Sequence, residues 1–193
     1  VIRGKSGHVA YPDTLINPIH QAMPAINALA CKQWDQGNDF FPATTFQVSN
    51  FNAGVGVQNV VPGDAQIEFN FRYSSASTQA GLIAQTEAIL DAHGLDFEIQ
   101  WSLSGEPFLT EKGQLIDAAV ATLRAITGQE VILSTGGGTS DGRFIAPYGI
   151  ELIELGLVNK TIHKVNERVR VGDLAVLTTI YTDLLVRLLG NHD

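Results

Sequence analysis

A histidine in a polar loop is the first residue of this sequence whose type and setting could support chemistry. His163 lies within residues 161–167 (TIHKVNE), in a polar loop that follows an apolar segment. Neutral imidazole is a common zinc ligand, so one interpretation is a metal ligand and the other is an ordinary surface histidine. No second His or Cys stands at ligand spacing in the sequence. The sequence therefore does not supply a complete metal site.

A glycine-rich loop at residues 136–142 (GGGTSDG) is the second candidate. It lacks the Lys of a P-loop and the third Gly of a dinucleotide-binding loop. It does contain G-x-S-x-G with Ser140 at its centre, the pattern of a serine-hydrolase nucleophile elbow, with His163 as the possible base. A flexible turn and a cradle of backbone N–H groups for a substrate carboxylate are the other interpretations.

Two further polar residues stand at the ends of predicted strands. His8 lies in the glycine-flanked segment 7–12 (GHVAYP), where it could be a base, an oxyanion donor or a solvated loop residue. Arg72 lies on the polar side of an alternating strand, where its guanidinium could bind a carboxylate through two parallel hydrogen bonds. The alternative for Arg72 is a solvent-facing ion pair.

The elements that would position His8 and Arg72 form a recognisable order. Asn17 caps a predicted helix that has Pro18 at its first position and ends near residues 36–37. Ser77 caps a second predicted helix, which Gly94 ends. Alternating apolar residues predict strands at 44–51, 65–73 and 95–103, in addition to an opening strand at 1–5. The order is β-α-β-β-α-β, a ferredoxin-like unit whose edge strands are available to a partner chain.

The region after Gly105 has a different pattern. Helices are predicted at 115–126 and 174–189, the latter capped by Asp173, and short strands at 130–133 and 151–155. Such an α/β region has too few elements for a core of its own. We therefore expect domains at residues 1–105 and 106–193, the second being half of a domain. Because the first residue is Val, we also expect a piece of a longer protein.

Composition excludes several classes of protein. Hydrophobic residues make up 45% and charged residues 17%, which argues against disorder. The net charge of −8 argues against nucleic-acid binding. The sequence contains no apolar run of 18 residues, so it predicts no membrane span. The single cysteine, Cys31, allows no internal disulfide and favours a cytoplasmic protein.

Five motifs occur together in order: GHVAYP at 7–12, NVVP at 59–62, SGEPFLT at 104–110, STGGGTSDGRF at 134–144 and TIHKVNE at 161–167. The sequence resembles the succinyl-diaminopimelate desuccinylases, di-zinc amidohydrolases related to aminoacylases and carboxypeptidases. The resemblance implies an α/β fold, with a ferredoxin-like lid for dimerisation and the C-terminal half of a zinc-hydrolase catalytic domain. It also implies a cytoplasmic homodimer that binds two Zn²⁺ ions, with Co²⁺ as a possible substitute.

The resemblance further implies a reaction and residue roles. Water would cleave N-succinyl-LL-2,6-diaminopimelate to succinate and LL-2,6-diaminopimelate, in lysine and diaminopimelate biosynthesis. His163 would be a metal ligand, and His8 would stabilise the oxyanion in the neighbouring subunit. The residues implied in substrate binding are Tyr11, Asn59, Arg72, Ser104, Gly138, Thr139 and Asn159. Gln58 stands where relatives often carry Asn, so either Gln58 or Asn59 could contact the substrate.

The resemblance also implies that several site residues lie outside this sequence. The other metal ligands and the glutamate general base would precede residue 1, so we expect the 193-residue chain to be inactive alone. Two alternatives remain: a serine hydrolase that uses Ser140, and a noncatalytic dimerisation or ligand-binding module.

Overall fold

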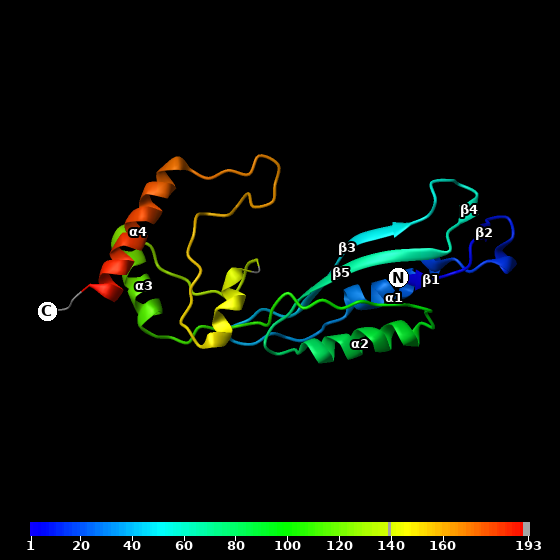
Figure 1. The fold of residues 1–193 in the computed structure, drawn as a ribbon, viewed down its shortest axis with the longest axis horizontal. Coiled ribbons are helices and arrows are strands. Elements are labelled where there is room, and N and C mark those ends of the chain that lie inside the picture. Colours follow the sequence, from blue (N-terminus) through cyan, green and yellow to red (C-terminus); the bar gives the residue numbers. More distant parts are fainter. Residues whose placement is uncertain (139, 191–193) are drawn as a thin grey trace. The chain divides into compact units, whose positions relative to one another are not determined.

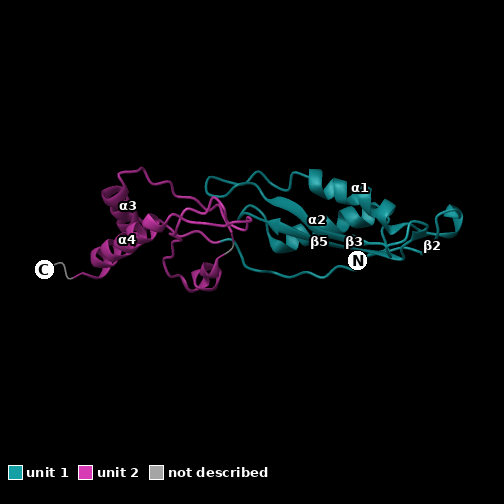
Figure 2. Cartoon of the chain, turned by 90° about the horizontal axis from the view of Figure 1, so that it is seen from above, with its two compact units in different colours: residues 1–107 teal, residues 108–193 magenta. Residues whose placement is uncertain are grey.

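The structure, a computed structural model, describes residues 1–138 and 140–190. It divides into unit 1, Val1–Pro107, and unit 2, Phe108–Asp193 (Figure 2). The predicted boundary after residue 105 lies close to this division. The fold is α/β, as predicted, and each unit is described separately below.

Unit 1 is built on an antiparallel sheet in the order β1-β5-β3. The strands are β1 (Ile2–Arg3), β5 (Asp64–Arg72) and β3 (Thr45–Ala53). Along β5 the side chains alternate between exposed and at least partly buried, which confirms the alternation predicted there. A bulge between Val48 and Asn50 interrupts the pairing of β3 with β5.

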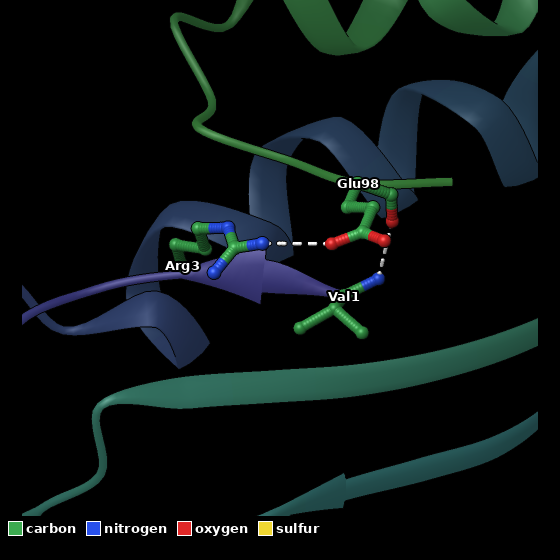
Figure 3. Close-up of polar contacts among 3 residues, drawn as sticks. All are labelled: Val1, Arg3 and Glu98. Carbon is green, nitrogen blue, oxygen red and sulfur yellow. Dashed lines mark hydrogen bonds and ion pairs between the residues drawn. The ribbon is translucent and has the colours of Figure 1, made fainter. Parts of the chain in front are cut away.

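The segment 95–98 lies beside β1 and extends the sheet. Phe97 forms a single antiparallel bridge with Ile2. The Glu98 carbonyl accepts from the Val1 nitrogen at 2.7 Å, and the Arg3 guanidinium donates to the Glu98 carboxylate at 2.7 Å (Figure 3). The predicted strand at 95–103 is therefore wrong in extent: β1 has only two residues, so later residues find no partner there. The exposed Arg3–Glu98 pair adds at most about 1 kcal/mol.

Two helices, α1 (Pro18–Cys31) and α2 (Gln79–Ala92), cover one face of this sheet (Figure 1). Asn17 caps α1 as predicted: its Oδ1 accepts from the Ile19 nitrogen at 3.0 Å. The helix ends at Cys31, before the predicted end near residues 36–37. Thr78, not Ser77, caps α2, with its Oγ1 accepting from the Gly81 nitrogen at 3.1 Å. The core between helices and sheet contains Ile2, Ala22, Ala25, Leu29, Trp34, Phe46, Leu82, Leu90 and Leu95.

Ser77 does not cap α2 because its hydroxyl donates to Asp35, at 2.5 Å. The Asp35 carboxylate also accepts from the backbone nitrogens of Gly37 and Thr44, each at 2.8 Å, and from the Thr44 hydroxyl. Burial alone would raise the pKa of Asp35, but these hydrogen bonds outweigh it and hold the pKa well below its usual range. Asp35 thus joins the segment after α1 to the start of β3 and to the β5–α2 connection.

We predict that Asp35→Asn destabilises unit 1 by about 2–4 kcal/mol at pH 7, because an amide cannot accept all these hydrogen bonds. A lowered folded pKa means that the stabilisation is present above the unfolded value of about 3.9 and is lost as pH falls through the folded value. The difference between variant and wild type should therefore shrink in acid.

Urea unfolding followed by tryptophan fluorescence measures this, since both tryptophans, Trp34 and Trp101, lie in unit 1. The control is Asp91→Asn at the exposed end of α2, which should change stability by less than about 0.5 kcal/mol. Equal stability of Asp35→Asn and wild type at pH 7 would contradict the role of this carboxylate.

Unit 2 is organised around α3 (Gln114–Thr127) and α4 (Val171–Leu189). The two helices pack together, and the Thr122 hydroxyl on α3 donates to Asp183 on α4 at 2.7 Å. The predicted cap of the last helix is wrong, since Asp173 lies inside its first turn. The strands predicted at 130–133 and 151–155 are absent from the described part of unit 2. A strand requires a hydrogen-bonded neighbour, and these apolar segments have none among the described residues.

Short elements complete the chain. Strands β2 (Gly7–His8) and β4 (Val60–Val61) form a separate two-stranded sheet, and η1 (Pro12–Thr14) follows β2. In unit 2, η2 (Asp141–Phe144) and η3 (Ala146–Tyr148) follow the glycine-rich loop. Within the described residues, no helix is both long and apolar enough to cross a membrane.

Candidate active site

Three predicted site residues of unit 1 lie together where β2 pairs with β4. His8 pairs with Val60 in the antiparallel register, and the Val9 nitrogen donates to the Asn59 carbonyl at 3.1 Å. The rings of His8 and Tyr11 lie 5.7 Å apart between centroids. We call His8, Tyr11 and Asn59 the tip cluster. The three residues of this cluster are exposed to solvent, and Tyr11 is 64% exposed.

The imidazole of His8 is held by its own turn. Its Nδ1 accepts from the backbone nitrogen of Ala10 at 3.1 Å. The carbonyl of His8 accepts from the Tyr11 nitrogen at 2.9 Å, which closes the turn. The side chain is therefore exposed, and one of its ring nitrogens is hydrogen-bonded to the backbone of its own turn.

Arg72 and Ser104 lie apart from the tip cluster. Arg72 ends β5, whose nine residues from Asp64 span roughly 25 Å. Ser104 is exposed and precedes Gly105, whose carbonyl accepts from the Tyr73 hydroxyl at 3.4 Å. Unit 1 therefore carries its predicted site residues in two places, the tip cluster and this strand end.

The strand end contains a pair that the sequence did not indicate. The Tyr73 hydroxyl donates to the Glu106 carboxylate at 2.7 Å. Burial raises the pKa of Tyr73, and the Glu106 carboxylate raises it further, so this phenol stays protonated. The alternation along β5 predicts only that Tyr73 lies on the apolar side of the strand. No local sequence pattern links Tyr73 to Glu106.

In unit 2, Asn159 and His163 share one loop. The Asn159 carbonyl accepts from the Ile162 nitrogen at 3.0 Å, and the Thr161 hydroxyl bonds to both the nitrogen and the carbonyl of Arg168 at 3.0 Å. His163 is exposed and has a left-handed backbone, with φ of 57°. Its nitrogen donates to Glu167 Oε2 at 3.3 Å. Such a backbone is uncommon for a non-glycine residue and often occurs at functional sites.

The glycine-rich loop gives no support to a serine nucleophile. The Ser140 hydroxyl accepts from the Gly142 nitrogen at 3.0 Å and thereby caps η2. Among the described residues, no hydrogen bond joins Ser140 to His163, and no strand precedes the loop as a nucleophile elbow requires. Gly138 is exposed, and Thr139 lies outside the described residues.

A metal site needs several ligand side chains close together. His163 has the chemistry of a zinc ligand and is accessible. The described part of the chain contains no group of three or more His, Cys, Asp or Glu that could hold an ion. The described residues therefore do not form a metal site by themselves, and a role for His163 as a ligand stays a prediction.

Comparison with known proteins identifies the family. Residues 1–98 match the model of the peptidase dimerisation domain, M20_dimer. The chain therefore belongs to the peptidase dimerisation domain family.

The curated relatives agree with the motif resemblance. The chain is 57% identical over 189 residues to the succinyl-diaminopimelate desuccinylase of Pseudomonas syringae pv. syringae. It is 53% identical over 188 residues to the enzyme of the same name from Thioalkalivibrio sulfidiphilus. These matches cover 98% and 97% of this chain but 49% and 50% of the relatives. The chain thus spans about half the length of the curated relatives it matches.

Solved structures share the fold. The aminopeptidase PepT of Bacillus cereus matches with a TM-score of 0.75 at 23% identity, over 97% of this chain and 50% of that protein. The M20 family metallo-carboxypeptidase of Sulfolobus solfataricus matches with a TM-score of 0.66 at 16% identity, over 97% and 60%. These likenesses confirm the α/β fold expected from the sequence.

Proposed function

We propose that this chain is part of a metal-dependent amidohydrolase that cleaves N-succinyl-LL-2,6-diaminopimelate to succinate and LL-2,6-diaminopimelate, in the cytoplasm. The observation that carries the proposal is 53–57% identity to desuccinylases over nearly the whole chain. Residues 1–105 would form the lid and dimerisation domain, and residues 106–193 the C-terminal part of the catalytic domain.

His163 would be one zinc ligand in the complete enzyme, the other ligands coming from the half that the longer relatives have in addition. Zinc, or cobalt in its place, would lower the pKa of a bound water and polarise the amide carbonyl. The closed turn between Thr161 and Arg168 would hold the His163 backbone in one conformation.

The substrate carries three carboxylates and meets a chain of net charge −8, so local donors must bind it. Arg72 would bind one carboxylate, and the N–H groups of the glycine-rich loop could bind another. The loop around His163 contains Lys160, Lys164, Arg168 and Arg170 and a single acidic residue. The remaining substrate contacts are assigned to Tyr11, Asn59, Ser104, Gly138, Thr139 and Asn159.

A homodimer would account for the distance between His8 and Arg72 within one unit 1. Because the tip cluster lies roughly 25 Å or more from the end of β5, His8 and Arg72 of one unit 1 cannot bind one small substrate together. In a homodimer, His8 of one copy could instead complete the site of the other and donate to the oxyanion. The separation of these residues favours such sharing.

Hydrolysis of succinyl-diaminopimelate by the full-length protein tests the proposal. We expect turnover that a chelator abolishes and that added zinc or cobalt restores, while the 193-residue chain alone shows none. Ser140→Ala should retain turnover, and a fluorophosphonate should not inhibit it. Chelator-resistant turnover that Ser140→Ala abolishes would favour a serine hydrolase, and a dimeric full-length protein without turnover would favour a noncatalytic module.

A further inference from the structure

The contact between Ala10 and His8 determines which nitrogen of the imidazole carries the proton. The backbone N–H of Ala10 lies 3.1 Å from His8 Nδ1 and can only donate. A ring nitrogen that accepts a hydrogen bond has no proton of its own. In neutral His8 the proton therefore resides on Nε2, and the ring presents an N–H donor at that position.

His93 provides the opposite case in the same unit. Its Nδ1 lies 2.8 Å from the carbonyl oxygen of Ile89, which can only accept. The proton of neutral His93 therefore resides on Nδ1. The chain thus contains two exposed histidines whose backbone partners select opposite tautomers.

We infer that the backbone N–H of Ala10 is a positioning group that holds His8 as an Nε2–H hydrogen-bond donor. Two backbone interactions support the turn: β2 pairs with β4 before it, and the Tyr11 nitrogen donates to the His8 carbonyl within it. The inference rests on the proposed function for its purpose, because an N–H donor fixed in advance suits an oxygen that gains negative charge. It assigns His8 to donation and not to proton abstraction.

The tautomers can be read from long-range ¹H–¹⁵N spectra of the 193-residue chain labelled with ¹⁵N-histidine, at about pH 8.5, where imidazoles are neutral. We expect the Nε2–H pattern for His8 and the Nδ1–H pattern for His93. Ala10→Pro removes the N–H, so the His8 shifts should move toward those of a solvent-averaged ring such as exposed His20. Ala10→Gly keeps the N–H and should keep the His8 pattern.

An Nδ1–H pattern for His8 in the wild type would overturn the inference without any variant. So would unchanged His8 shifts in Ala10→Pro, provided that the His93 pattern shows unit 1 to be folded. The readout requires neither substrate nor metal. A full-length protein without amidohydrolase activity would therefore overturn the proposed function and leave this inference standing.

Discussion

Replacing His163 with alanine in the full-length protein is expected to lower kcat/KM for succinyl-diaminopimelate by about 10³-fold or more. The reason is that metal ions supply several kcal/mol of charge stabilisation in such reactions, and about 4 kcal/mol corresponds to 10³-fold. Bound zinc, measured on the purified protein by atomic absorption, should fall with the activity. The hydrogen bonds of the turn around His163 do not use the imidazole, because they are made by the backbone and by Thr161 and Glu167, so the variant removes none of them.

The matched control is His20→Ala, which removes an exposed imidazole from α1 of unit 1. It should leave zinc content and kcat/KM at wild-type values. A His163→Ala protein with full zinc content and near wild-type turnover would show that this imidazole is a surface residue, and the metal assignment would fail.

His8→Ala in the full-length protein is expected to lower kcat by about 10²–10³-fold, the usual effect of removing one oxyanion donor. Zinc content should stay at the wild-type value, which separates this variant from His163→Ala. Steady-state kinetics over substrate concentrations up to saturation measures kcat and KM separately. A loss confined to KM would instead indicate that His8 contributes ordinary substrate binding.

Mixed dimers test whether His8 serves the partner's site. Co-expression of differently tagged His8→Ala and His163→Ala subunits allows the mixed dimer to be purified. It would contain one site with both histidines and one with neither, so about half of wild-type activity should return. Mixed dimers as inactive as both parents would show that His8 acts in its own subunit.

The local features of unit 1 were predictable because they depend on neighbouring residues. Asn17 followed by Pro18 is a strong helix start, and the alternation along β5 follows from one buried face. The strand at 95–103 was overestimated because its extent depends on β1, a distant partner of two residues. Ser77 was misassigned because the Asp35 carboxylate, 42 residues away, takes its hydroxyl.

The candidate site was predictable in its residues but not in its arrangement. The motifs identified His8, Asn59 and His163, whereas the proximity of His8 to Asn59 depends on the pairing of β2 with β4. The Tyr73–Glu106 pair joins residues 33 positions apart, so no periodicity reveals it. The residue roles themselves stay predictions until the variants are measured.

The bulge in β3 has a consequence for how copies of this chain can associate. Among the described residues, β3 is paired on one edge only, and such an edge invites further strands. A strand that is offset in its middle, between Val48 and Asn50, cannot serve as template for a flat, endlessly repeating ladder. An edge of this irregular shape is a poorer template for open-ended strand addition than a regular one.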